Sequence, residues 1–175
     1  MPQLQTATFA NGCFWCTEAV FQRLKGVASV QSGYSGGTVE NPSYYEVSSG
    51  ETGHAESLQV TYDPSEISYE TLLKIFFATH DPTTLNRQGN DVGTQYRSEI
   101  FYHDEEQKMT AEKVKDELDK SGEFKDPIVT AISEYKNFYP AEEEHNNYYD
   151  NNHRRIFCRL VLLIVCRRKD RFWFR

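Results

Sequence analysis

The segment QTATFANGCFWCTEAVFQRL, residues 5–24, gives the clearest indication of how this chain folds. Residues 5–10 have the character of a strand, which the pair Asn11-Gly12 interrupts. Apolar side chains then recur at helical spacing, and Gly26 stands where the C-terminal cap of a helix belongs. The stretch therefore predicts a strand that passes directly into a helix, with Cys13 at the junction.

Outward from this junction, short strands and helices continue along the chain. Further strands are expected at residues 27–34, 56–62, 100–102 and 128–132. Helices are expected after Ser68, which can cap one, and over residues 104–120.

The segments between these elements are long. Residues 35–53 and 80–97 show no sustained period and are expected to be loops, while residues 139–150 are acidic and expected to be partly helical. The elements interleave without strict βαβ regularity, which favours a mixed arrangement over a doubly wound sheet. We expect an α/β fold, an α+β roll with a ferredoxin-like mixed sheet core, flanking helices and long loops.

The composition is that of one globular domain. The chain has 175 residues, of which 38% are hydrophobic and 26% charged, so a single domain over residues 1–175 is expected. The net charge of −7 repels phosphate backbones and argues against nucleic acid as the main partner.

Apolar segments and cysteines bear on the location of the protein. Residues 156–166 form an apolar run interrupted by Arg159, shorter than the about 20 residues of a membrane-spanning helix, and are expected to be a buried strand. The first twelve residues carry no Lys or Arg and no continuous apolar run, which argues against a secretory signal. Four cysteines are too few for a disulfide scaffold, so reduced thiols and a cytoplasmic location are expected, with no membrane partner.

The motif Gly12-Cys13-Phe14-Trp15-Cys16 carries the local chemical signal. A thiol at a helix N-terminus faces unpaired backbone N–H groups and the positive end of the helix dipole, and both favour the reactive thiolate. Its position therefore marks Cys13 as a candidate nucleophile. Cys16 follows one helical turn later, where it can form a disulfide and so resolve a sulfenic acid. The two aromatic residues between the thiols belong either to the core or to an apolar pocket.

Two other interpretations of this motif remain open. A Cys-x2-Cys pair can be half of a zinc site, but the spacings of Cys158 with Cys166, or of His145 with His153, do not fit a usual zinc knuckle. The pair can also belong to a general thiol–disulfide oxidoreductase, although a Pro soon after the second Cys, usual in such proteins, is absent.

Further candidate residues lie in residues 50–56 and 87–96, which read GETGHAE and RQGNDVGTQY. A carboxylate held among aromatic side chains loses solvation, so Glu56 can keep its proton near neutral pH and act as an acid. Taken alone, a Glu at the start of a strand is more often only a solvated residue. Tyrosine hydroxyls here and at Tyr44 can donate hydrogen bonds to a small polar ligand.

Taken together, these segments resemble the peptide methionine sulfoxide reductases of type A, from about Thr8 to Asp150. The resemblance is carried by ordered motifs that read GCFWC at 12–16, GYSGG at 33–37, NPSY at 41–44, TGHAE at 52–56, HDP at 80–82 and RQGNDVGTQYR at 87–97.

The resemblance implies a role for each polar residue of the site. Cys13 would attack the sulfoxide sulfur, and Glu56 would protonate or hydrogen-bond the departing oxygen. Tyr44 and Tyr96 would donate to the same oxygen, and Asp91 would assist through a water.

It also implies the substrate and the reductant. Phe14 and Trp15 would enclose the methyl group, and the family accepts the S epimer. The expected activity is reduction of methionine S-sulfoxide, free or in proteins, with no cofactor or metal and with thioredoxin or another dithiol as reductant. Cys16 is expected to resolve the sulfenic acid, with Cys158 and Cys166 as alternatives. The tail, residues 159–175, departs from the family pattern, so no role is carried over to it.

Overall fold

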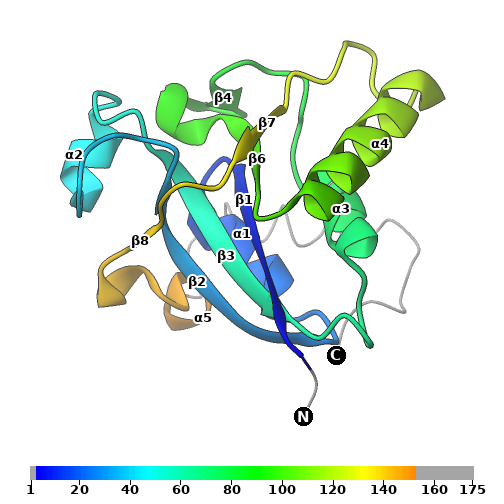
Figure 1. The fold of residues 1–175 in the computed structure, drawn as a ribbon. Coiled ribbons are helices and arrows are strands. Elements are labelled where there is room, and N and C mark those ends of the chain that lie inside the picture. The colour runs from blue at the N-terminus through cyan, green and yellow to red at the C-terminus, as the bar shows by residue number, and fades with distance from the viewer. Residues whose placement is uncertain (1–2, 153–175) are drawn as a thin grey trace.

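A computed structural model describes residues 3–152, and its main feature is a six-stranded sheet (Figure 1). In spatial order the strands are β7 (Ala131–Glu134), β6 (Ser98–Tyr102), β1 (Gln5–Asn11), β3 (Ala55–Tyr62), β2 (Val27–Ser35) and β8 (Tyr139–Pro140). Neighbouring strands are antiparallel except β6 and β7, which are parallel. A separate hairpin is formed by β4 (Arg87–Gln88) and β5 (Asp91–Val92).

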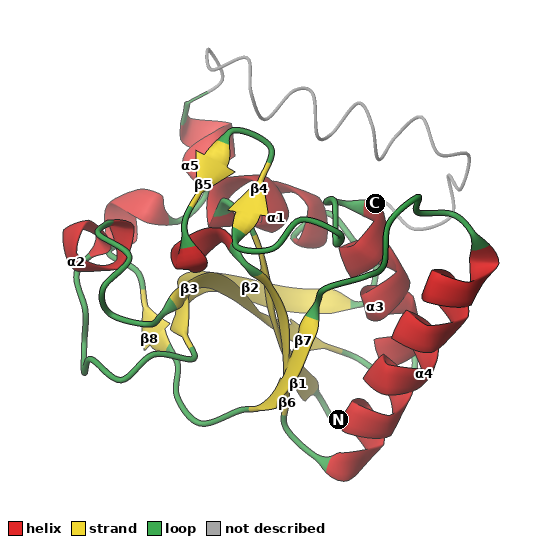
Figure 2. Cartoon of the chain, turned by 90° about the horizontal axis from the view of Figure 1, so that it is seen from above, coloured by secondary structure: helices red, strands yellow, loops and turns green. Residues whose placement is uncertain are grey.

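Helices of different lengths surround this sheet. They are α1 (Phe14–Phe21), α2 (Tyr44–Ser48), α3 (Tyr69–Ala78), α4 (Glu105–Ser121) and α5 (Tyr148–Asn151), with single 3-10 turns at Thr94–Tyr96 and Glu143–His145. The helix α1 packs on β2 and β3, α3 packs on β1 and α4, and α4 also contacts β6 and β7. Figure 2 shows the sheet in the middle, with α1 on one side of it and α3 and α4 at its right. The expected mixed α/β fold with a central sheet and flanking helices is confirmed.

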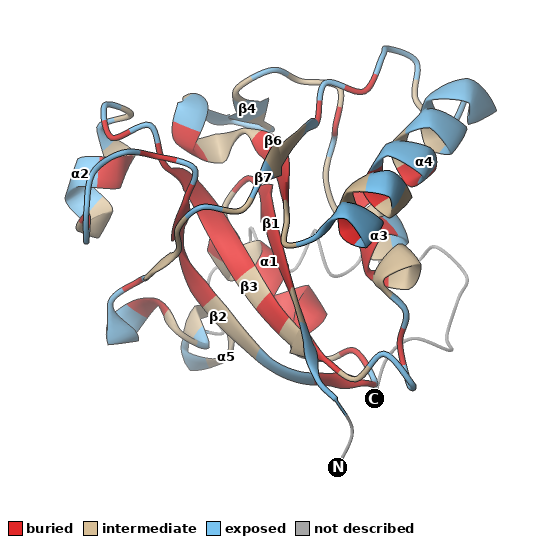
Figure 3. Ribbon diagram, viewed as in Figure 1, coloured by how far each residue is buried: buried red, intermediate tan, exposed pale blue. Residues whose placement is uncertain are grey.

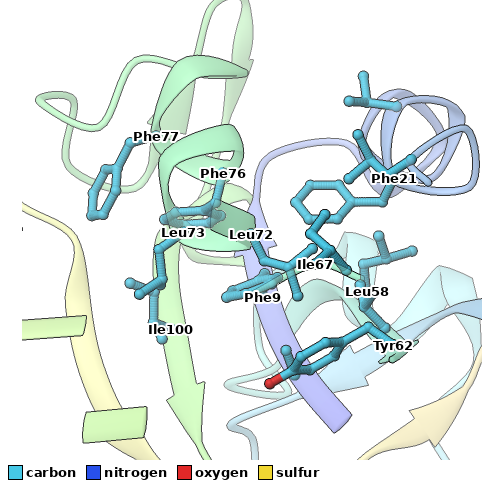
Figure 4. Packing of buried hydrophobic residues seen from close by; sticks show 14 of the residues in the cluster. Phe9, Phe21, Leu58, Tyr62, Ile67, Leu72, Leu73, Phe76, Phe77 and Ile100 are labelled. Atoms are coloured by element: carbon cyan, nitrogen blue, oxygen red, sulfur yellow. The ribbon is translucent and has the colours of Figure 1, made fainter. Parts of the chain in front are cut away.

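The core that holds these layers together is centred on Phe9 of β1. Its ring lies 5.7 Å from the ring of Phe21 in α1 and 5.2 Å from that of Phe76 in α3. Both helices therefore cover the same face of β1, as the packing in Figure 4 shows. Figure 3 shows that the central strands β1 and β3 are largely buried. Because β1 is fixed in this way, its end at Asn11 and the start of α1 are fixed too.

The helix starts expected from the sequence are confirmed by their caps. The Ser68 hydroxyl accepts from the Thr71 N–H at 3.1 Å, which starts α3. The Asp104 carboxylate accepts from the Gln107 N–H at 2.8 Å, which starts α4. Each of these bonds satisfies a backbone donor that the helix itself leaves unpaired.

Two element boundaries differ from expectation by three residues or more. The helix α1 ends at Phe21, and Gly26 lies in the turn before β2, so it does not cap the helix. The strand expected over 128–132 begins only at Ala131, because earlier N–H groups bond outside the sheet. The Ile128 N–H donates to the Asp119 carboxylate at 2.9 Å, and the next N–H donates to the Pro82 carbonyl.

The two expected loops contain short elements. The helix α2 lies inside residues 35–53 and starts with a capping box in which Ser43 and Glu46 each bond the other's backbone. The hairpin β4–β5 and the turn Thr94–Tyr96 lie inside residues 80–97. Elements this short have no sequence period to detect, so only their turn and cap residues could have indicated them. Residues 139–150 are partly helical, as expected.

The apolar run 156–166, with Cys158 and Cys166, lies outside the described residues, so the strand expected there stays a prediction. Within residues 3–152, none of the helices has the length and apolar character needed to cross a membrane.

Candidate active site

Cys13 occupies the N-cap of α1, at the junction that the sequence predicted. Its carbonyl accepts from the Cys16 N–H at 3.2 Å, while its side chain makes no capping hydrogen bond. The preceding Gly12 has φ 95, and a Cβ at this position would lie 2.7 Å from Cγ of Gln88. Glycine is therefore required for β1 to turn into α1 beneath the β4–β5 hairpin. The thiol of Cys13 sits at the positive end of the helix and is partly exposed.

Cys16 lies in the first turn of the same helix and is also partly exposed. Both thiols line one cavity of about 140 Å³. The other lining residues come from the end of β1, from α1, from the end of α3 and from the hairpin; they are Asn11, Thr17, Thr79, Gln88, Gly89 and Asp91. A reactant that reaches Cys13 through this cavity therefore also meets Cys16.

Glu56, at the second position of β3, is buried directly beside the nucleophile. Its carboxylate accepts from the Phe14 N–H at 3.1 Å, which is the first backbone donor after Cys13. Only 2% of its surface is exposed. Burial raises the pKa of Glu56, the bond from Phe14 opposes this in part, and the negative charge of Asp91 adds a smaller increase, so that the pKa is about 8. Glu56 is therefore mostly protonated at neutral pH and can act as an acid.

Two tyrosine hydroxyls share the surroundings of Glu56. Burial raises the pKa of Tyr44 and of Tyr96, and the negative charges of Glu56, Asp91 and Cys13 raise both further. Both hydroxyls therefore keep their protons and remain donors. Asp91, on β5, is exposed, but partial loss of solvent raises the pKa of its carboxyl too. The five polar residues expected at the site therefore lie close enough for their charges to interact. They are Cys13, Tyr44, Glu56, Asp91 and Tyr96.

The two aromatic residues between the thiols differ in burial. Phe14 is 1% exposed and packs in a cluster with Tyr34 and Val47, so it belongs to the core. Trp15 is only partly buried, and its ring lies 6.1 Å from the ring of Tyr44 and nearly parallel to it. Trp15 and Tyr44 therefore form an aromatic pair at the first turn of α1, where the charge of Cys13 also acts on the Tyr44 hydroxyl.

Glu142 links the site to the segment that follows β8. Its carboxylate accepts from the Tyr34 hydroxyl at 2.9 Å and from the Tyr44 N–H at 2.8 Å. Although burial raises the pKa of Glu142, these bonds outweigh it and leave the pKa below its usual value. The carboxylate thereby anchors the start of α2, which carries Tyr44.

Two histidines of the sequence motifs, the buried His54 and the partly buried His80, hold the backbone around the site. The Gly37 N–H donates to Nδ1 of His54 at 3.0 Å, and Nε2 of the same ring donates to the Val39 carbonyl at 2.8 Å. A Cβ at Gly37 would clash with the His54 ring, so only glycine allows this approach to the start of β3. His80 donates from Nδ1 to the Phe76 carbonyl and accepts at Nε2 from Ser98, and burial lowers the pKa of His80 to about 4.

Sequence reasoning missed Tyr34, Glu142 and His145 as parts of the site. The ring of His145 lies 4.6 Å from that of Tyr44, and its Nδ1 accepts from the indole N–H of Trp15 at 3.3 Å. From the sequence, His145 is a candidate only as a zinc ligand. Within residues 3–152, no group of three or more His, Cys, Asp or Glu side chains is arranged to hold a metal ion.

Comparisons with known proteins agree on one family. The family model described as peptide methionine sulfoxide reductase matches residues 5–172. The peptide methionine sulfoxide reductase MsrA of Natronomonas pharaonis is 55% identical over 155 residues, which cover 89% of this chain and 87% of that protein. Reduced Mxr1 from Saccharomyces cerevisiae superposes with a TM-score of 0.81 at 38% identity, over 89% of this chain and 90% of that one. Mxr1 in complex with Trx2 superposes with a TM-score of 0.58 at 28% identity, over 83% and 85%.

Proposed function

The chain belongs to the peptide methionine sulfoxide reductase family, and we propose that Cys13 is the nucleophile with which it reduces methionine S-sulfoxide. The activity of the family is that of a peptide-methionine (S)-S-oxide reductase. What remains is to assign the steps of this reaction to side chains of this chain.

One observation carries the assignment: the buried carboxyl of Glu56 bonds to the N–H that directly follows Cys13. Expelling oxygen from sulfur requires a proton at the transition state, and a positioned acid contributes about 10²–10⁴-fold to such a step. A carboxyl with a pKa near 8 holds that proton at neutral pH.

In the first step, the thiolate of Cys13 attacks the sulfoxide sulfur. The oxygen moves from the substrate sulfur to the Cys13 sulfur and takes the proton of Glu56. The substrate leaves as the thioether methionine, and Cys13 is oxidised to the sulfenic acid. Glu56 is left as a carboxylate and regains its proton from solvent before the next turnover.

The remaining residues bind and orient the sulfoxide in this proposal. The hydroxyls of Tyr44 and Tyr96 donate to the sulfoxide oxygen, and Asp91 assists through a water. Trp15 forms the apolar wall for the methyl group, and Phe14, buried in the core with its ring 6.1 Å from that of Trp15, supports this wall. Because the chiral sulfur is held by its oxygen and its methyl group at once, only one epimer presents its sulfur to Cys13.

In the second step, a resolving thiol attacks the sulfenic acid, forms a disulfide with Cys13 and releases water. We propose Cys16 for this role, supported by its place one turn along α1 and by the cavity that it shares with Cys13. Cys158 and Cys166 are the alternatives, and both lie outside the described residues.

We propose thioredoxin as the reductant of the resulting disulfide. Two electrons and two protons from a dithiol restore both thiols by disulfide exchange. This chain is similar to Mxr1, and the solved complex of Mxr1 with Trx2 supports this choice. Dithiothreitol should replace thioredoxin in vitro.

The direct test supplies the two epimers of methionine sulfoxide separately, with thioredoxin or dithiothreitol. The S epimer should be reduced and the R epimer should not. Reduction of insulin at a comparable rate would favour a general thiol–disulfide oxidoreductase instead. Mass-spectrometric mapping of the first disulfide tests the resolving step: a Cys13–Cys158 bridge that forms first, with Cys16→Ser turning over normally with thioredoxin, would exclude Cys16.

Three expectations about the fold, the domain organisation and the location of the protein also stand as proposals. A ferredoxin-like core is supported by the antiparallel order β6-β1-β3-β2, with α1 and α3 as the crossover helices. A single domain is supported by the continuous core that joins the sheet to α1, α3 and α4. The cytoplasmic location rests on the sequence alone, and cell fractionation would test it.

A further inference from the structure

The indole of Trp15 is held from two sides by the segment that follows β8. Its Nε1–H donates to Nδ1 of His145 at 3.3 Å, across a sequence separation of 130 residues. The ring of Tyr148 stacks on it with centroids 3.9 Å apart and planes 11° apart. The orientation of Trp15 is therefore set by residues that lie outside its own helix.

His145 is placed among the aromatic residues of the site. It is 6% exposed, and its ring centroid lies 5.6 Å from that of Phe14 and 4.6 Å from that of Tyr44. Because Nδ1 accepts the bond from Trp15, the neutral ring carries its proton on Nε2.

This Nε2 is buried and has no hydrogen-bond partner in the part of the chain that the structure describes. The carboxylates of Glu142 and Glu144 stand at 3.8 Å and 4.0 Å from it, beyond hydrogen-bond length. A buried polar atom without a partner lowers stability, and a phenylalanine would fill the same space without one. Packing alone therefore does not account for a histidine here, whereas the bond to Trp15 does.

We propose that His145 is a positioning residue for substrate binding, because its hydrogen bond fixes the Trp15 indole as the wall against the methyl group of methionine sulfoxide. This inference rests on the proposed function of the site. The methyl group touches the wall both before and during the reaction, so the contact stabilises the ground state and the transition state alike. Loss of such a contact raises KM and leaves kcat nearly unchanged.

Two substitutions separate the hydrogen bond from the shape of the ring. His145→Phe keeps an aromatic ring but removes the acceptor, and His145→Asn keeps an acceptor oxygen near the position of Nδ1. We expect His145→Phe to raise KM for methionine S-sulfoxide about fivefold, the factor that one ordinary hydrogen bond contributes. His145→Asn should recover most of this loss. Equal KM values for wild type and His145→Phe would overturn the proposal.

A double-mutant cycle shows whether His145 acts through Trp15. In a Trp15→Phe background there is no indole to orient, so adding His145→Phe should change KM by less than about twofold. A further fivefold rise in that background would mean that His145 acts through Tyr44 or through general stability, and would contradict the proposed route.

The hydrogen bond can also be observed without turnover. The chain contains two Trp, so a Trp173→Phe variant leaves Trp15 as the source of the indole ¹⁵N–¹H signal. In His145→Phe this proton should move upfield and exchange about fivefold faster, and His145→Asn should restore both. An unchanged indole signal would refute the bond. Absence of sulfoxide reduction by the wild type would instead refute the proposed function, so the two failures are distinguishable.

Discussion

Two clusters of buried rings in this protein differ in what surrounds them. The rings around Phe9 pack mainly against apolar side chains and the faces of aromatic residues; the polar exceptions include His80, whose ring lies 4.5 Å from that of Phe76, and the Tyr62 hydroxyl, which donates to Gln5. The rings around Phe14 pack among groups that form hydrogen bonds: the hydroxyl of Tyr34, the imidazole of His145 and the carboxyl of Glu56. The first cluster holds the sheet to its helices. The second cluster is also buried, but it includes polar atoms that a bound sulfoxide can contact.

This contrast predicts different effects for substitutions in the two clusters. Changes at Cys13 and Glu56 should alter the rate and spare folding, and a change at Phe9 should do the reverse. Four substitutions of decreasing effect test this difference between the two clusters.

Cys13→Ser should have the largest effect on activity. It removes the sulfur that attacks the substrate and is oxidised in the first step, so single-turnover reduction of methionine S-sulfoxide should fall by more than about 10⁴-fold. Thermal unfolding should stay close to wild type, because the side chain of Cys13 makes no capping bond. Normal single-turnover reduction by this variant would end the proposed mechanism.

Glu56→Gln should slow sulfoxide reduction by about 10²–10⁴-fold and change substrate affinity far less. The glutamine has the size of the acid but no proton to give. In the wild type, the rate that depends on this acid should decrease as the pH rises through about 8, because the carboxyl is then ionised. Single-turnover rates across the pH range test both statements. A variant that is unstable yet as fast as wild type when folded would make Glu56 structural.

Phe9→Ala should affect stability instead. Removing a fully buried ring should cost about 3–5 kcal/mol of unfolding free energy, measured by urea denaturation. The single-turnover rate of the folded fraction should stay near wild type. Leu85→Ala is a matched control, since Leu85 is 72% exposed and should change stability by less than about 0.5 kcal/mol. A loss of rate comparable to that of Glu56→Gln would remove the distinction between the clusters.

Tyr34→Phe should have the smallest effect of the four. It keeps the ring in the cluster and removes the hydroxyl that donates to Glu142, which should cost about 1 kcal/mol of stability. Because the Tyr44 N–H still bonds to Glu142, the rate should fall only a few-fold. An effect on the rate as large as that of Glu56→Gln would place Tyr34 among the reacting groups.

Sequence reasoning predicted the local features of this molecule well. The strand before Cys13, the cap at Ser68 and the amphipathic helix over residues 104–120 depend on residues close together in the chain. These features arise from helix caps and from hydrophobic periodicity, and both can be recognised from residues that are neighbours in the sequence. The resemblance to a known family supplied the roles of Glu56 and the tyrosines, which composition alone did not indicate.

The contacts between distant segments could not be predicted in this way. The bond from Trp15 to His145 spans 130 residues, and the carboxylate of Glu142 reaches back to Tyr34 and Tyr44. The residues near His145 in the sequence do not show which aromatic ring will contact it, because this contact depends on how β8 and the following turn pack. The late start of β7 has the same origin, since Asp119 and Pro82 take the N–H groups that a strand would use.

The proposed reaction requires a carboxyl beside Cys13 that holds a proton at neutral pH, and a titration of Glu56 measures whether it does. The carboxyl ¹³C signal, assigned by its disappearance in Glu56→Gln, can be followed by NMR as the pH is raised. We predict a midpoint near 8, as burial dictates. A midpoint near the ordinary value of 4.5 would mean that Glu56 is ionised when the sulfoxide binds, and would contradict its role as the acid.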